Sequence, residues 1–251
     1  MAEGPSLWRR LWGEGSGPSV ARVYHRLLAL VFLAAFWSLG VQLDVLIGSR
    51  GLLPAAEFLE MVRGRPDLGF WDAPTLFWDD PSDAMLRLGI HAGVLMSLLA
   101  LLGVLPRLMW ALLVPLYLSY VVLCGTFLSF QWDNLLLESA FLAVFLPRRY
   151  RSVLVPLLFR VLLFKLYWES GLAKWQSHLR DWHDGSAMTV YYETAPLPTW
   201  LAWHAHHLPE AWHHIESWFA VGFELVVPWL FFGPRPGRLF AFVVITGFQL
   251  V

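Results

Sequence analysis

The sequence has little charge and almost no cysteine. Lys, Arg, Asp and Glu make up 15% of the 251 residues, whereas soluble globular domains contain about 25%. This shortage excludes an ordinary soluble protein. The single cysteine, Cys124, excludes an intrachain disulfide and a Cys-x-x-Cys redox pair. The net charge is −1 and no basic stripe is interleaved with aromatic residues, so we expect no nucleic-acid partner.

What the chain has in abundance is apolar residues. Hydrophobic residues make up 57% of it, the mean hydropathy is +0.54, and several runs approach the roughly 20 residues that cross a bilayer. The predicted fold is an all-α, polytopic membrane helical bundle with about seven apolar runs. These runs lie at 27–47, 84–105, 108–128, 134–147, 153–174, 215–232 and from 239 onward. The last run is shorter than a full span, so we expect a truncated seventh helix whose continuation is missing.

The segments between the runs divide into short turns and two long polar stretches. Residues 1–20 are rich in Gly, Ser and Pro and predict a flexible N-terminal tail, followed by the membrane bundle at 21–251. Residues 48–83 and 175–213 form the long connections. Within the first of them, Ala55–Arg63 follows Pro54 and predicts a short helix.

The basic residues predict the orientation of the bundle. With the N-terminus in the cytoplasm, every short cytoplasmic connection is rich in arginine, as the positive-inside rule requires. The arginines placed inside are Arg9, Arg10, Arg22, Arg26, Arg107, Arg148, Arg149, Arg151, Arg235 and Arg238. The two long connections, rich in acidic and aromatic residues, then face the non-cytoplasmic side.

Several charged residues fall inside the predicted spans, and six of them are candidates for one network. A charge at the centre of a bilayer costs at least about 2.5–3.5 kcal/mol, so we expect a mutually neutralising network. Its members are Glu138, Arg160, Lys165, Glu169, Lys174 and Glu224.

Spacing predicts some of the partners in this network. Lys165 and Glu169 are four residues apart and share a helix face, while Arg160 and Lys174 can snorkel toward opposite membrane surfaces. We expect Glu138 to pair with one of the three bases. A structural network is favoured; a polar pocket open to the outer side is the alternative.

The stretch SFQWDNLLLES, residues 129–139, is the second polar feature of the spans. Gln131 and Trp132 suit the membrane interface, where amphipathic aromatic side chains collect. Asp133 and Asn134 are predicted to cap the N-terminus of the following helix.

Histidine is concentrated in the second long connection. No His-Glu-x-x-His motif or other recognised ligand spacing is present, so we predict an interfacial segment with no metal. No catalytic motif or nucleotide-binding fingerprint occurs, so we predict no catalytic residue and no cofactor. Seven of the nine histidines lie here, at His178, His183, His204, His206, His207, His213 and His214.

Several stretches together resemble the lipase maturation factor family. They are LIGSRGLLPA (46–55), FLSFQWDNLLLESAFLA (127–143), RVLLFKLYWESGLAKWQS (160–177), DWHDGSAMTVYYETAPLPTWLAWHAHHLP (181–209) and FELVVPWLFFGPRPGRLFAFVVITGFQ (223–249). The membrane bundle of that family is distantly similar to that of the vitamin-K-dependent carboxylases. The chain departs from the eukaryotic pattern at Ala195, where those members tend to carry Gln.

The resemblance implies a membrane chaperone that helps secreted lipases fold and assemble into active dimers. Eukaryotic members reside in the endoplasmic reticulum and continue into a soluble C-terminal domain. The composition of this chain looks bacterial, which would place it in the inner membrane with its long connections in the periplasm.

We therefore expect a maturation factor without chemistry of its own, in contact with membrane lipid and an exported client such as a lipase. The family motifs and exposed aromatic residues are the candidate client contacts. They are Gln131, Trp132, Asp133, Trp182, Tyr191, Tyr192, Glu193, Pro196, Pro198, Trp200 and Trp203.

Two alternatives stay open. One is a membrane enzyme in which burial makes Lys165 a base, with Glu169 or Glu138 as its partner. The other is a transporter-like bundle in which Lys165, Glu138 and Glu224 line a pathway. The oligomeric state is left open.

Overall fold

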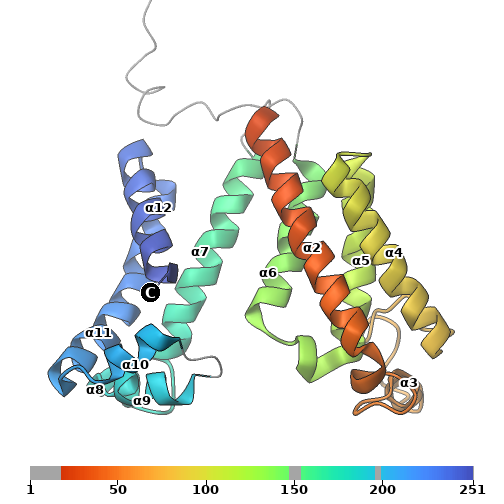
Figure 1. Cartoon of the computed structure of the whole chain (residues 1–251), viewed down its shortest axis with the longest axis horizontal. Coiled ribbons are helices and arrows are strands. Elements are labelled where there is room, and N and C mark those ends of the chain that lie inside the picture. Colours follow the sequence, from red (N-terminus) through yellow and green to blue (C-terminus); the bar gives the residue numbers. More distant parts are fainter. Residues whose placement is uncertain (1–17, 147–153, 196–198, 251) are drawn as a thin grey trace, which may run out of the picture. The chain divides into compact units, whose positions relative to one another are not determined.

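The computed structural model describes residues 18–146, 154–195 and 199–250 (Figure 1). Every regular element in this described part is a helix. Residues 15–159 form one compact unit, and residues 160–251 belong to a second. Each unit is described separately below.

The first unit is built from long apolar helices. They are α2 (Pro18–Leu46), α4 (Asp83–Leu102), α5 (Pro106–Cys124) with the 3₁₀ turn η1 (Gly125–Leu128), and α6 (Gln131–Phe145). Glycines allow α2 and α4 to approach closely, since a Cβ on Gly93 would lie 2.4 Å from the ring of Phe36. Small residues serve this purpose in membrane bundles. Phe32, Trp110 and Tyr120 are fully buried in the same core.

The short helix predicted after Pro54 is present as α3 (Ala55–Arg63), with the predicted bounds. Its buried residues are Ala55, Leu59 and Val62. This spacing of four and three residues puts one apolar stripe against the core, and Pro54 fixes the entry of the chain. The prediction is confirmed.

The second unit combines long helices with three short ones. It contains most of α7 (Leu154–Trp175), then α8 (Asp181–Asp184), α9 (Ala187–Thr194), α10 (Trp200–His206), α11 (Glu210–Val226), η2 (Val227–Phe232) and α12 (Arg235–Leu250). Its apolar core is small and contains Tyr167, Phe223, Phe231, Ala241 and Ile245. Polar contacts therefore carry much of the packing in this unit.

Helices occupy every predicted apolar run, and the all-α class is confirmed. Among the described residues, four segments are long and apolar enough to cross a membrane: Val20–Leu46, Asp83–Leu102, Pro106–Leu128 and Glu210–Phe232. Helices α6 and α12 have 15 and 16 residues. Seven crossings and the orientation stay predictions.

Three predicted boundaries were wrong for reasons of helix chemistry. Helix α2 begins at Pro18, so residues 18–20 are helical and not part of a tail; residues 1–17 lie outside the described part. Helix α12 begins at Arg235, not at 239, because Pro236 sits in its first turn, where the missing N–H is tolerated. Helix α11 begins at Glu210, five residues before the predicted start, and gives way to η2 next to Pro228.

Candidate functional site

Short helices lie within the long polar connection predicted at 175–213, and its place on the non-cytoplasmic side stays a prediction. Helices α8, α9 and α10 and the first turns of α11 make up what we call the short-helix segment, residues 181–218. The Met188 amide donates to the Ser217 hydroxyl at 3.0 Å and thereby ties α9 to α11. Asp184 accepts the Ser186 amide at 2.8 Å. Hydrogen bonds from the side chain and the backbone of Ser186 lower the pKa of Asp184. Side-chain contacts of this kind stabilise helices too short to be stable alone.

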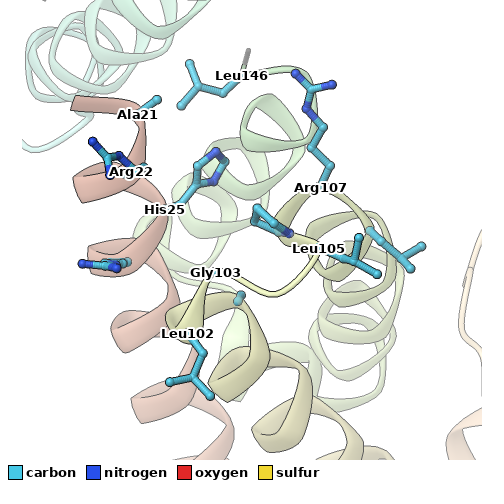
Figure 2. A pocket seen from close by; sticks show the side chains of 12 residues that line it. Ala21, Arg22, His25, Leu102, Gly103, Leu105, Arg107 and Leu146 are labelled. Carbon is cyan, nitrogen blue, oxygen red and sulfur yellow. The ribbon is translucent and has the colours of Figure 1, made fainter. Parts of the chain in front are cut away.

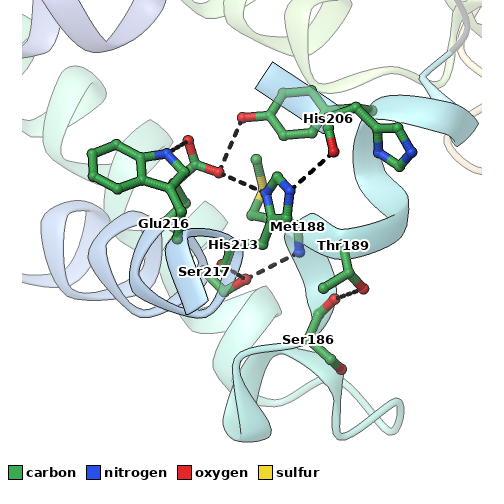
Figure 3. Close-up of polar contacts among 9 residues, drawn as sticks. Ser186, Met188, Thr189, His206, His213, Glu216 and Ser217 are labelled. Atoms are coloured by element: carbon green, nitrogen blue, oxygen red, sulfur yellow. Dashed lines mark hydrogen bonds and ion pairs between the residues drawn. The ribbon is translucent and has the colours of Figure 1, made fainter. Parts of the chain in front are cut away.

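Glu216 is the centre of a polar network inside this segment (Figure 3). One carboxylate oxygen accepts the Trp212 indole N–H at 2.6 Å. The other accepts the Tyr192 hydroxyl at 3.3 Å and lies 3.1 Å from His213 Nδ1. Burial, followed by the charge of Glu216 and the hydrogen bond to it, raises the pKa of Tyr192 to about 12. One carboxylate thus holds α9 and α11 together.

His213 is buried, with 4% of its surface exposed. Its Nε2 lies 3.2 Å from the carbonyl oxygen of His206, while Nδ1 faces Glu216. The ring thus contacts a carboxylate of its own helix and a backbone carbonyl of α10. His213 thus lies inside the short-helix segment, and the interfacial position of the histidines of this region stays a prediction. Among the described residues, no group of His, Cys, Asp and Glu is arranged to hold a metal ion.

Large aromatic side chains remain exposed on this framework. Trp200 is 77% exposed, Trp203 61% and Tyr191 52%. The Trp203 carbonyl is held by His207 Nδ1 at 2.7 Å. Helix α10 is joined to α9 through His206 Nε2, which lies 3.0 Å from Glu193. The exposed rings are thus carried by a positioned backbone. Other exposed rings of the segment belong to Trp212 and Trp218.

Below the short-helix segment, an ion pair connects α7 with α11. Lys174 Nζ lies 2.6 Å and 2.8 Å from the two carboxylate oxygens of Glu224, and it also donates to Ser170 Oγ at 2.9 Å. The Glu224 side chain is 7% exposed and that of Lys174 23%. Two members of the predicted charge network are thus paired, and the Lys174 ammonium neutralises a buried carboxylate. The same ammonium lies 5.4 Å from the centre of the Trp182 ring, which links this pair to α8.

Close packing accompanies the ion pair. A Cβ on Gly171 would lie 2.9 Å from Cβ of Glu224 and 3.1 Å from Leu225. Only glycine therefore fits at this crossing of α7 and α11 without displacement.

The other members of the predicted charge network lie at different depths. Glu138 and Arg160 are half-buried, whereas Lys165 and Glu169 are exposed. Their mutual pairing stays a prediction. The exposure of Lys165 gives no support to the buried base of the enzyme alternative.

The family motif around residue 131 lies in the first unit. The prediction that Asp133 in this motif caps a helix was wrong. Asp133 is 4% exposed and accepts the Tyr117 hydroxyl at 2.8 Å, so it does not cap the helix; its contact with a client stays a prediction. Helix α6 already begins at Gln131, after the extended residue Phe130. Gln131 and Trp132 are exposed.

The remaining candidate contacts divide between buried and exposed positions. Trp182 and Tyr192 are half-buried and Glu193 is exposed. Pro196 and Pro198 lie outside the described residues. Sequence reasoning missed Glu216 and Ser217, although 213, 217, 220 and 224 mark a buried helical stripe at spacings of three and four residues.

Comparisons with known proteins agree with this helical, membrane-embedded architecture. A family model described as "Lipase maturation factor transmembrane domain" matches residues 19–251. Lipase maturation factor 2 of Homo sapiens is 38% identical over 261 residues, covering 88% of this chain and 36% of that protein. The Xenopus laevis protein of the same name is 37% identical, with 88% and 35% covered. Lipase maturation factor 1 of Homo sapiens is 34% identical, with 85% and 41% covered.

The chain spans about 35–41% of the length of these relatives. No solved structure matches it significantly. Four candidate spans and a match over nearly the whole chain identify an integral membrane protein. The chain belongs to the lipase maturation factor family.

Proposed function

We propose that this chain is the membrane portion of a maturation factor that binds folding lipases on the non-cytoplasmic side. The observation that carries the proposal is the set of exposed rings on the short-helix segment, above all Trp200 and Trp203. A folding chain offers unburied apolar surface, and exposed aromatic side chains are suited to bind it. The names of the relatives supply the lipase as client.

The buried polar network supports this role because it fixes the shape of the surface. The contacts of Glu216 with Tyr192, Trp212 and His213 hold the backbone that presents the rings. A surface ordered before binding loses less conformational entropy when the client docks. Binding therefore needs no cofactor and no covalent step.

The predicted orientation of the bundle determines which compartment the exposed rings face. The short-helix segment connects two apolar helices at the end opposite to the arginine-rich connections, so under the predicted orientation it faces away from the cytoplasm. By family analogy this compartment is the lumen of the endoplasmic reticulum, and in a bacterium it is the periplasm.

The test is lipase maturation in cells whose own maturation factors are inactivated. The chain is co-expressed with a secreted lipase, and lipase activity per amount of secreted lipase protein is measured. We expect the chain to raise this ratio and the W200A/W203A variant to lose most of the increase. The matched control is W71A, which removes an 88%-exposed tryptophan from the other long connection and should keep the increase.

Two results would contradict the proposal. The first is a chain that accumulates in the membrane and leaves lipase activity unchanged. The second is a W200A/W203A variant as active as the unchanged chain, since the exposed rings would then serve another purpose, such as resting among lipid headgroups.

A further inference from the structure

The first unit contains a cavity of about 700 Å³ near the N-terminal end of α2 (Figure 2). Ala21, Arg22 and His25 of α2 lie on one side of it, and Leu105 and Arg107 of the turn between α4 and α5 lie on the other. The cavity is remote in sequence from the short-helix segment and serves none of the contacts described for it.

The backbone of the α4–α5 turn shapes this cavity. Helix α4 ends at Leu102, the residue after it, Gly103, has a φ of +79°, and Leu105 has a φ of +40°. Leucine in the left-handed region costs about 1–2 kcal/mol, and such residues are concentrated at ligand-binding positions. The turn leaves the side chains of Leu102, Leu105 and Leu108 exposed along the cavity. One part of its lining is thus apolar.

The other part of the lining is cationic. Arg22, Arg26 and Arg107 contribute three guanidinium groups, and no carboxylate is among the described lining residues. The ring of His25 is buried, and its Nδ1 accepts the Trp110 indole N–H at 2.8 Å. Arginine forks are suited to bind phosphate oxygens.

We propose that this cavity binds an acidic phospholipid of the cytoplasmic leaflet, with the headgroup phosphate among the arginines and the acyl chains along the leucines. The positive-inside pattern places Arg22, Arg26 and Arg107 at the cytoplasmic surface, where anionic lipids are enriched. Basic pockets between membrane helices on that side bind anionic headgroups. A free phosphate would use the arginines but would leave the apolar side uncovered.

Native mass spectrometry of the detergent-purified chain tests the proposal with three probes: phosphatidylglycerol, phosphatidylcholine and glycerol 1-phosphate. We expect phosphatidylglycerol to bind at least tenfold more tightly than either of the others. The R26Q/R107Q variant should bind it about thirtyfold more weakly, because each arginine near an anionic headgroup contributes about a factor of five. The R50Q/R65Q control removes the same charge from the connection after α2 and should change binding less than twofold.

Equal binding of phosphatidylcholine, or equal weakening in R50Q/R65Q, would overturn the proposal in favour of unspecific lipid contact. Glycerol 1-phosphate bound as tightly as the lipid would show a site for free anions only. Arg26 and Arg107 are exposed, so both variants should fold, which circular dichroism checks. If the double variant unfolds, two other results decide the proposal. They are the preference of the unchanged chain for phosphatidylglycerol and the weaker binding of that lipid by the R26Q single variant. Lipase maturation is not a readout here, so this result is independent of the proposed function.

Discussion

Lys174 Nζ lies 2.6 Å from Glu224 Oε2, and this ion pair joins α7 to α11. The two residues are 50 positions apart in the sequence. Each charge would be costly alone in an apolar bundle, and together they leave no net charge at the crossing. The pair therefore makes the packing of these two helices specific.

Removing one partner of this pair should destabilise the protein more than removing both. Glu224→Leu leaves the ammonium without its carboxylate, and we expect the free energy of unfolding in detergent to fall by about 2–3 kcal/mol. The K174M/E224L variant should lose less than Glu224→Leu alone, because neither charge is then left without a partner. Tryptophan fluorescence during denaturant unfolding measures these differences.

The matched control for the ion pair is Arg87→Gln. It breaks a pair of similar length with Asp44, but those side chains are 52% and 63% exposed. We expect a much smaller loss than for Glu224→Leu, because water screens an exposed pair. Equal losses in E224L and R87Q would contradict a special role of burial at Glu224.

Gly171 should tolerate no side chain. Because a Cβ there would lie 2.9 Å from Glu224, Gly171→Ala should lower the free energy of unfolding by about 1–3 kcal/mol. Gly222→Ala on α11 is the control, since nothing lies within 4 Å of its added Cβ. It should be neutral or stabilise by up to about 1 kcal/mol. A neutral Gly171→Ala would show that the helices do not cross as closely as described.

Loss of Glu216 should loosen the short-helix segment selectively. Glu216→Ala removes the acceptor of Tyr192 and Trp212 and the partner of His213. We expect faster amide hydrogen exchange in α9 and α10, with unchanged exchange in α4 and α5. Glu210→Ala is the control, because its side chain is 82% exposed and 3.8 Å from His214. Uniformly unchanged exchange in the E216A variant would contradict the network.

Tyr192 should titrate near pH 12, which ultraviolet absorbance of tyrosinate measures. Its pKa is raised to about 12 from an ordinary value of 10.0. Between these values the unfolded chain loses this proton while the folded chain keeps it, so stability falls as pH rises from 10 to 12. We expect a loss of about 1 kcal/mol in that window. The Y192F variant should lack the component of the titration near pH 12. If the component that Y192F loses lies near pH 10 instead, the buried contact of Tyr192 with Glu216 is contradicted.

Local patterns predicted the elements of this fold well. Hydropathy located the apolar helices, because a membrane-crossing helix needs a long apolar run regardless of its partners. Helix α3 was predicted residue for residue, since Pro54 and the stripe Ala55, Leu59 and Val62 specify it locally. The start of α11 was missed because its first turns are rich in His and Trp, which hid the buried stripe that includes His213 and Ser217.

Partners distant in the sequence could not be predicted in the same way. The need for a counter-charge at Glu224 follows from its position in an apolar run, but the choice of Lys174 depends on how α7 and α11 cross. Asp133 looked like a helix cap because its type and position fit one. Its actual partner, Tyr117, lies 16 residues earlier on another helix. The cavity beside Leu105 depends on a left-handed turn at a residue type that does not signal one.

The central claim is that the short-helix segment contacts the client directly, and site-specific photocrosslinking tests it. A photoreactive phenylalanine analogue replaces Trp203 in one variant and Trp71 in the other, both exposed tryptophans. Each variant is irradiated in cells during a pulse of synthesis of a secreted lipase. We predict crosslinks between residue 203 and the newly made lipase, which disappear as the lipase matures, and few from residue 71. Crosslinks from residue 203 to lipid alone, or equal lipase crosslinks from both positions, would contradict the account.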